Sequence, residues 1–290
     1  MAERVTVSVI ITAYRRAAVV GAAIASALAQ TYPVFEVVVV DDASGDDTPA
    51  AVLAERDRRV RLVRLHDNLG PAGAMNAGIA AARGDLVALL DSDDLWLAEK
   101  LERQVAAWQA HPSRDRVLVA SRVIEEVDGV QIRVRPDRVM RPREDVGDYL
   151  FVHDGLIQTS TMLLPRTLAQ AVGFDAATRR HSDPGFVLRL RAAGATILHL
   201  PDALIRWRAV GGVARVSGAD ALRPSLDWLD RHAAMLSPRA RVAFRYRNHI
   251  RIVRRNRPVA AAWLTLRALF AGVIGRREIA RLIRRVGARA

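Results

Sequence analysis

The sequence predicts an α/β fold built on a mostly parallel sheet with helices on both faces, and three observations support it. In the first ninety residues, short β-branched runs alternate with alanine-rich helical segments, which is the spacing of βαβ units. The expected strands are apolar almost throughout, as strands covered on both faces are. Three of them end in polar or acidic residues. Because ligands bind outside the carboxyl ends of such strands, these ends are predicted to face one crevice.

The individual elements follow from periodicity. Strands are predicted where β-branched apolar residues run together, and helices where apolar residues recur every three or four positions. The Thr48-Pro49 pair marks a helix start, since proline is favoured in the first turn. The predicted strands are residues 5–14, 35–44, 59–65 and 85–91. The predicted helices are residues 17–30, 46–56 and 70–83, followed by an amphipathic helix over 96–104 that uses Trp96 in packing.

From about residue 116 the pattern becomes mixed. Two strands are expected on either side of Asp128-Gly129, a dipeptide typical of hairpin turns. Residues 157–174 predict a strand and then a short helix, and residues 181–201 predict a helix and then a strand. After about residue 216 only helical patterns remain.

Composition limits the class of protein. A chain of 290 residues that is 51% apolar can bury a sizeable core, in one large or two closely packed domains. The net charge of +13 is uneven, because residues 239–290 hold fifteen arginines and one acid, which leaves the remaining residues close to neutral. A basic tail on a neutral body indicates an anionic surface met by one end. The lack of cysteine excludes disulfides and suits a cytosolic protein, and the first residues show no signal-peptide pattern.

Acidic residues gather at two of the strand ends. Asp41-Asp42 precedes ASGDDT, for which ordinary turn and cap chemistry is the alternative to a binding role. Asp91, Asp93 and Asp94 lie within four residues, and carboxylates this close repel unless a cation or hydrogen-bond donors offset them. Hard cations such as Mg²⁺ and Mn²⁺ prefer oxygen ligands. The second cluster therefore predicts a divalent-cation site, with a solvated strand end as the alternative.

The sequence contains neither of the common phosphate-binding loops. No G-x-G-x-x-G follows the first strand, and no G-x-x-x-x-G-K-[ST] occurs anywhere. A cation held by the carboxylates would neutralise phosphate instead. This favours a nucleotide bound across the crevice with its diphosphate on the cation.

Four stretches together resemble family 2 glycosyltransferases with the GT-A fold. They occur in the family's order across roughly residues 5–210, and they are VSVIITAYRR, ALAQTYPVFEVVVVDDASGDDT, NLGPAGAMNAGIAAARGDLVALLDSDDLWLAEKL and VGFDAATRRHSDPGFVLRLRAAG. The resemblance implies inverting transfer of a sugar from a nucleoside-diphosphate sugar, first of all a UDP-sugar, to an acceptor hydroxyl. It also implies a divalent cation, Mn²⁺ or Mg²⁺, as cofactor. Residues 1–115 would bind the nucleotide sugar, residues 116–215 would carry the acceptor side and catalytic base of the same domain, and residues 216–290 would form a basic helical extension.

Carried over position by position, the resemblance assigns donor contacts. Ala13, Tyr14 and Asp42 are expected around the donor base, and Asp91 is expected near the donor ribose or sugar. Many relatives have an arginine before Asn76, where this chain has Met75. We expect Met75 to lie in the core, which puts a donor contact at that position in doubt.

The resemblance also assigns the cation and the base. Asp93 corresponds to the metal-binding second acid of the D-x-D motif, and Asp94 is kept as a candidate because the last acid is the ligand in some relatives. Asp183 is the expected catalytic base, although SDPGFVLRL also fits a helix cap, and one Asp can serve both purposes. His181 is expected at the acceptor or behind the base, with an ordinary loop histidine as the alternative. Pro184-Gly185 replaces a common aromatic-acid pair and predicts a wider or more flexible acceptor pocket.

The tail contains an apolar run from Val259 to Gly275 that Arg267 interrupts, which is short for a membrane span. Arginine-rich helices with Trp, Leu and Phe on one face suit an interfacial helix on an anionic membrane. Packing of this face on the catalytic body, or a basic contact with nucleic acid, are the alternatives. The expectation is a cytoplasmic enzyme, peripheral on the inner face of the cell membrane, that uses a saccharide or lipid-linked acceptor and has no nucleic-acid partner.

Two other function classes are open at this point. A nucleotidyltransferase using NTP and metal also needs an α/β sheet, but it usually has a Gly-rich loop after the first strand, whereas here no glycine occurs before Gly21. A non-enzymatic basic protein that binds membrane or nucleic acid would explain the tail. It would leave the carboxylates at the strand ends unexplained.

Overall fold

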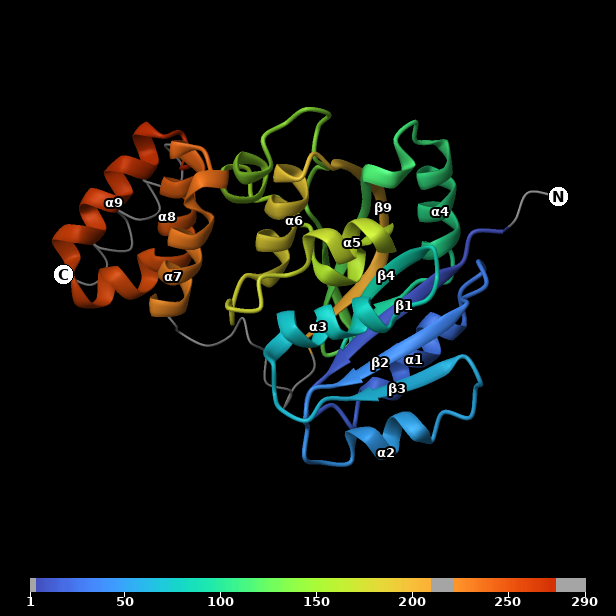
Figure 1. Cartoon of the computed structure of the whole chain (residues 1–290). Helices are drawn as coiled ribbons and strands as arrows, with labels where there is room; N and C mark the ends of the chain where they lie inside the picture. The colour runs from blue at the N-terminus through green and yellow to red at the C-terminus, as the bar shows by residue number, and fades with distance from the viewer. Residues whose placement is uncertain (1–3, 210–221, 275–290) are drawn as a thin grey trace.

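The computed structural model describes residues 4–209 and 222–274, with only the backbone of residues 209, 251, 252 and 254–256 (Figure 1). In this part, nine strands form one sheet in the order β3-β2-β1-β4-β8-β6-β9-β5, with β7 paired to β6. The strands are β1 (Val7–Ala13), β2 (Glu36–Asp41), β3 (Val60–Arg64), β4 (Leu86–Asp91), β5 (Leu95–Trp96), β6 (Val117–Val127), β7 (Val130–Arg135), β8 (Leu163–Pro165) and β9 (Thr196–Ala209). Strands β1 to β4 pair in parallel, and the pairs beyond β4 are mixed.

Helices cover both faces of the sheet. They are α1 (Val20–Leu28), α2 (Thr48–Leu53), α3 (Gly70–Ala81), α4 (Lys100–Ala110), α5 (Arg166–Val172), α6 (Ser182–Ala192), α7 (Leu222–His232), α8 (Pro238–Asn256) and α9 (Pro258–Phe270). Successive residues of β1 face opposite sides, so that Ile11 packs in one core with α1, α2 and α4, and Ile10 packs in another with α3, α5 and α6. This two-sided burial is what the nearly continuous apolar strands predicted.

Several local predictions are confirmed. Asp128 and Gly129 join β6 to β7, and both have positive φ, as the tight turns of β-hairpins require. Met75 is buried in the core under α3, as expected. Trp96 is also buried in packing.

The helix predicted over residues 96–104 is wrong at its start. Trp96 belongs to β5, where it pairs with Ile205 of β9, and α4 begins only at Lys100. The extended backbone lets the Trp96 indole N–H reach the carbonyl oxygen of Ser160 at 2.9 Å. This long-range bond fixes residues 95–96 as a strand, and the helical period of the following residues could not reveal it.

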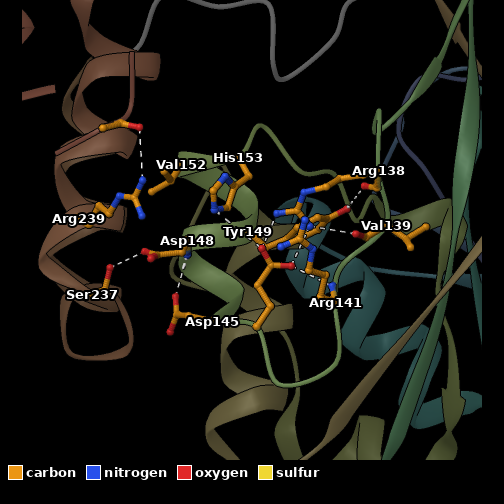
Figure 2. Close-up of polar contacts among 12 residues, drawn as sticks. Arg138, Val139, Arg141, Asp145, Asp148, Tyr149, Val152, His153, Ser237 and Arg239 are labelled. Carbon is orange, nitrogen blue, oxygen red and sulfur yellow. Dashed lines mark hydrogen bonds and ion pairs between the residues drawn. The ribbon is translucent and has the colours of Figure 1, made fainter. Parts of the chain in front are cut away.

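Helices α7, α8 and α9 lie together at one end of the molecule, beside α6 and far from β3 (Figure 1). The short π-helical turn η2 (Asp148–Val152) joins them to the sheet domain. Ser237 at the start of α8 donates a hydrogen bond of 2.5 Å to Asp148 Oδ1 (Figure 2). The sheet itself continues across residue 115, and the predicted boundaries near residues 115 and 215 stay a prediction.

Candidate active site

The register of the parallel strands brings the predicted strand ends together. Ala13 of β1 pairs with Asp41 of β2, and Thr12 of β1 pairs with Asp91 of β4. Asp42 follows directly and donates its backbone N–H to the Ala13 oxygen at 2.9 Å. The carboxyl ends of three neighbouring strands therefore form one edge, as the sequence predicted.

The proposed base-binding side of this edge combines an exposed ring with a buried carboxylate. Tyr14 is exposed, and the Arg15 guanidinium lies 5.3 Å from its ring centroid. Asp42 is buried, and its Oδ1 accepts the backbone N–H of Leu69 at 2.7 Å, just before α3. Burial raises the pKa of Asp42, while backbone N–H groups of Leu69 and Gly70 oppose the rise. Asp42 thus orders the start of α3, which is the turn chemistry considered above. It does so at the same edge as the exposed Tyr14 ring, on which the Arg15 guanidinium lies.

Asp91 and Asp94 share one hydrogen-bond donor. Nε2 of the buried Gln158 donates to Asp91 Oδ2 at 2.9 Å and to Asp94 Oδ2 at 2.6 Å. Ser160 Oγ donates to the same Asp94 oxygen at 2.7 Å, and the Arg208 backbone N–H reaches Asp94 Oδ1 at 3.2 Å. Both oxygens of Asp94 are therefore engaged in holding the fold together.

Burial and mutual repulsion disfavour the charged forms of Asp91 and Asp94, although hydrogen bonds from Gln158 and Ser160 oppose this in part. Burial, followed by the charges of Asp94, Asp183 and Asp93, raises the pKa of Asp91 well above its usual range. Burial and the charge of Asp93 raise the pKa of Asp94 to about 7. Like charges forced together in this way are offset by a bound cation.

Asp93 is placed differently from its two neighbours. Its side chain is partly exposed, and the Arg16 guanidinium Nη2 lies 4.0 Å from its Oδ2, which is longer than a direct hydrogen bond. Since the oxygens of Asp94 are occupied by protein donors, Asp93 is the carboxylate better placed to receive an ion from the crevice.

The side-chain oxygens at this edge can supply only part of the coordination shell of a divalent cation. Within residues 4–209 and 222–274, no three acidic or histidine side chains converge to hold a metal by themselves. The residues present do fit a hard cation that takes one or two carboxylates and completes its shell with substrate phosphate oxygens, which is the usual arrangement for Mg²⁺. The unbalanced buried charge of Asp91 is the observation that supports this fit.

Asp183, the predicted base, lies in the first turn of α6 and is partly exposed. Its Oδ1 accepts the Thr159 hydroxyl at 2.5 Å, and its Oδ2 accepts the Thr159 backbone N–H at 3.3 Å. Burial raises the pKa of Asp183, while the Thr159 bonds oppose the rise. The charge of Asp183 in turn raises the pKa of Asp91, so the two carboxyl groups lie close enough to interact.

Sequence reasoning missed the segment that organises these acids. Gln158 and Ser160 bind the donor-side carboxylates, and Thr159 between them binds the base. All three are buried, in the turn η3 (Thr159–Thr161) and at its cap, directly before β8. The signal was available as four polar residues, QTST, interrupting an otherwise apolar run from Leu156 to Leu164. Buried polar side chains need partners, and here the partners are the site carboxylates.

His181 lies behind the base and connects it to the C-terminal helices. It adopts a left-handed backbone conformation, with φ at 58°, immediately before α6. Its Nε2 lies 2.8 Å from Ser225 Oγ of α7, and its ring makes edge contacts with Trp228 and Phe244. Burial lowers the pKa of His181 to about 4, so the ring is neutral near pH 7. These contacts favour the position behind the base over one at the acceptor.

The expected widening of the acceptor pocket at Pro184-Gly185 is not what the structure shows at position 185. Gly185 is buried, and a Cβ there would lie 2.9 Å from His232 Nε2 and 3.0 Å from Trp228 Nε1. The space left by the missing side chain is filled by α7. The sequence around residue 185 could not reveal this, because the filling residues lie more than forty positions away.

Comparison with known proteins identifies the first part of the chain. The model of the family described as glycosyl transferase family 2 matches residues 8–172. The amylovoran biosynthesis glycosyltransferase AmsB of Erwinia amylovora is 30% identical over 232 residues, which cover 78% of this chain and 77% of AmsB. An Escherichia coli protein, the UDP-Glc:alpha-D-GlcNAc-diphosphoundecaprenol beta-1,3-glucosyltransferase WfgD, is 42% identical over 100 residues, or 34% of this chain and 40% of WfgD.

The fold has a counterpart among solved structures. The crystal structure of S. aureus TarS 1-349 in complex with UDP-GlcNAc superimposes with a TM-score of 0.65 over 87% of this chain and 74% of TarS. The two sequences are 20% identical over that alignment. This likeness concerns the α/β architecture and its mixed sheet.

Proposed function

The chain belongs to glycosyl transferase family 2, and from that premise we propose that it is an inverting enzyme that transfers a sugar from a nucleoside-diphosphate sugar to an acceptor hydroxyl. One observation carries the proposal: the turn at residues 158–160 bonds Asp91, Asp94 and Asp183 at the carboxyl edge of the sheet. A donor and an acceptor bound at this edge would both lie within reach of the carboxylates that inverting transfer needs.

The donor occupies the side of the edge formed by β1, β2 and β4. Tyr14 offers an exposed ring for the base, with Ala13 and Asp42 beside it, and Asp91 faces the ribose or sugar. The partly exposed carboxylate of Asp93, helped by Asp91, would hold Mn²⁺ or Mg²⁺, and the bound cation would neutralise the diphosphate. The partly exposed guanidinium of Arg16 lies beside Asp93 on the same side of the edge.

Asp183 acts as the base on the acceptor side. The Asp183 carboxylate removes the proton of the acceptor hydroxyl while the hydroxyl oxygen attacks the anomeric carbon. The attack comes from the face opposite the diphosphate, which leaves. The raised pKa of Asp183 makes the carboxylate a better proton acceptor than an exposed Asp. Thr159 donates two hydrogen bonds that orient it, and His181 holds the start of α6 from behind.

The acceptor class follows from the relatives. AmsB is named for the synthesis of a polysaccharide, and WfgD is named for transfer to a diphosphoundecaprenol-linked sugar. We therefore propose a saccharide or lipid-linked acceptor in the synthesis of a cell-surface polysaccharide or glycolipid, with a UDP-sugar as the donor. An enzyme with such an acceptor would work peripherally on the inner face of the cell membrane, held by its basic C-terminal helices.

Family membership also decides between the function classes that the sequence left open. A nucleotidyltransferase, or a non-enzymatic protein that binds membrane or nucleic acid, does not account for a family 2 match over residues 8–172. A non-enzymatic protein would also leave the carboxylate edge without a role. Nucleic acid is not expected as a partner.

The experiment that tests this proposal is a thermal-shift screen of nucleoside-diphosphate sugars with and without Mn²⁺. A ligand that binds the folded state raises the melting temperature by mass action. We expect one donor to raise it by several degrees in Mn²⁺ and far less in a chelator. A screen in which nucleoside triphosphates stabilise the protein and no nucleotide sugar does would overturn the proposal.

A further inference from the structure

Helix α9 exposes four of its large apolar side chains, while Leu264 and Leu269 pack against the core. Val259 and Phe270 are each 83% exposed, and Trp263 is 62% exposed. Ala261 and Ala268, by contrast, are 4% and 0% exposed. A surface helix ordinarily has polar residues on the face away from the core, so the exposed apolar face of α9 is unusual.

The exposed residues form one continuous stripe. Val259, Trp263, Leu266 and Phe270 are spaced by four, three and four positions, which places them on one face along the whole of α9. We call these four residues the α9 stripe. Exposed apolar residues scattered singly are common, but a contiguous row with Trp and Phe marks an interaction surface.

The stripe is held on a fixed support. Arg239 of α8 donates from Nε to the Ala271 oxygen at 2.6 Å, just after the end of α9 (Figure 2 draws Arg239 with this bond). Ala268 of α9 lies in the same buried cluster as Ala243 and Phe244 of α8. Helix α9 thus packs on α8 through Ala261, Ala268 and the partly buried Leu264 and Leu269, while the residues of the α9 stripe are exposed. The helix itself lies at the outer end of the molecule (Figure 1). Packing on the body, which the sequence left open for the apolar run from Val259 to Gly275, therefore accounts for only one face of α9.

Charge indicates what covers the other face. Arg257 precedes α9, Arg267 lies next to Leu266 on the helix, and both are exposed. On α8, Arg241 and Arg245 are exposed as well. No acidic residue occurs from Ser237 to Gly275, so α8 and α9 themselves contribute only basic charges around the stripe. A protein partner would need a matching acidic rim around an apolar groove, whereas a bilayer with anionic headgroups supplies both features along its whole surface.

We propose that the α9 stripe is an interfacial membrane-docking surface, which inserts Val259, Trp263, Leu266 and Phe270 at the acyl boundary of an anionic bilayer and sets Arg257 and Arg267 at the headgroups. Trp at such a depth is favoured because its ring is apolar and its N–H meets the wet interface. Among the described residues, no helix is long and apolar enough to cross a bilayer. The α9 stripe lies in the interface plane, and this surface deepens the membrane part of the proposed function.

A hollow at the N-terminal end of the stripe supports this orientation. It has a volume of about 590 Å³ and is lined by Arg257, Pro258, Val259, Ala260 and Trp263. Four of its five lining residues are apolar and one is a cation. The hollow is shallow and open, and it combines an apolar surface with a cation, as the contact surface of a phospholipid requires.

The test is co-sedimentation of the full chain with vesicles, without any sugar donor, so its outcome is independent of transferase activity. Vesicles of equal parts phosphatidylglycerol and phosphatidylcholine are compared with phosphatidylcholine alone. We expect the double variant Trp263→Ser with Phe270→Ser to lower the partition coefficient on anionic vesicles at least about tenfold. The pair Arg257→Gln with Arg267→Gln should weaken binding to anionic vesicles and make the remainder less sensitive to salt.

A matched control is available on the hairpin of β6 and β7. Val130 and Ile132 are 63% and 55% exposed, yet they lie far from α9 in the chain, so Val130→Ser with Ile132→Ser should bind vesicles as the unmodified chain does. Equal binding by the α9 double variant would overturn the proposal. A second result would also overturn it: light scattering in which the unmodified chain is a dimer and only the α9 double variant is a monomer. The stripe would then be an interface between two copies of the chain.

Discussion

Thr159 holds Asp183 by two hydrogen bonds, one from its hydroxyl at 2.5 Å and one from its backbone N–H at 3.3 Å. On either side of Thr159, Gln158 and Ser160 bond the carboxylates Asp91 and Asp94. One short turn therefore fixes the proposed base relative to the donor side. Side chains in this turn should affect catalysis through position, although none of them is assigned a chemical step.

Replacing Thr159 by Val removes the hydroxyl donor and keeps the shape of the side chain. Asp183 loses its shortest hydrogen bond and can rotate away from the acceptor, so kcat should fall by about 100-fold while the KM for the donor changes little. Initial rates at varied donor concentration measure both. Thr159→Ser keeps the hydroxyl and should retain most of the activity. A Thr159→Val enzyme with an unchanged kcat would show that the bond has no catalytic part.

Replacing Gln158 by Leu leaves two buried carboxylates without their shared donor. Unsatisfied buried acceptors cost stability, so the free energy of unfolding should drop by about 1–3 kcal/mol. Denaturant unfolding at pH 8 measures the change. Gln170→Leu is the control, since Gln170 is an exposed residue of α5 whose amide makes only long hydrogen bonds, to the Ile79 oxygen at 3.3 Å and from Arg166 at 3.4 Å. It should change the stability by less than about 0.5 kcal/mol. Similar losses in both variants would contradict the role of Gln158.

Two substitutions distinguish Asp93 from Asp94 as the residue that binds the cation. Asp93→Asn should leave the melting temperature of the free protein nearly unchanged and abolish the extra stabilisation that Mn²⁺ gives to donor binding. Asp94→Asn should lower the melting temperature itself, because Gln158, Ser160 and the Arg208 backbone all donate to its carboxylate. The reverse pattern, with Mn²⁺ dependence lost only in Asp94→Asn, would make Asp94 the ligand.

Acid should destabilise the packing of α7 and α8 against α6, the helix that carries Asp183. Burial, and then the charge of Arg245, lower the pKa of His249 from 6.5 to about 4. Between these values the unfolded chain binds a proton that the folded chain does not, so stability is present above pH 6.5 and is lost as the pH falls towards 4.

Substitution of His249 by Phe tests this pH dependence. Phe keeps the ring that contacts Phe244 and removes the proton site, whose Nε2 has no hydrogen-bond partner in the described structure. At pH 5 the variant should retain about 1–2 kcal/mol that the unmodified chain loses, with little difference at pH 8. Melting temperatures at both values measure it, with the exposed His66→Phe as control. If the unmodified chain, His249→Phe and His66→Phe lose the same stability between pH 8 and pH 5, His249 is not the source of the acid sensitivity.

Much of the fold and part of the site could be predicted from the sequence because the relevant signals are local. The strand ends at Ala13, Asp41 and Asp91 follow from apolar runs that stop at polar residues, and parallel pairing then aligns them. The same local pattern located Asp183 at a helix start. What the sequence pattern could not supply was contact between distant segments.

The missed features all depend on such long-range contacts. Trp96 became a strand residue through β9, Gly185 was filled by Trp228 and His232, and Gln158 found its partners more than sixty residues away. The choice between Asp93 and Asp94 was open in the sequence for the same reason. Only the positions of Gln158 and Ser160 show that Asp94 is already engaged.

The most direct test of the account compares donor binding and sugar transfer in Asp183→Asn. Binding of the donor found by the thermal-shift screen is measured by calorimetry in Mn²⁺, and transfer is measured as nucleoside diphosphate released in the presence of bacterial membrane lipid as acceptor. Asn keeps the size of the side chain and its bonds to Thr159 in part, but it cannot take a proton. The account predicts donor affinity within about threefold of the unmodified enzyme and transfer reduced at least about 1,000-fold. Transfer at the unmodified rate by Asp183→Asn would contradict it.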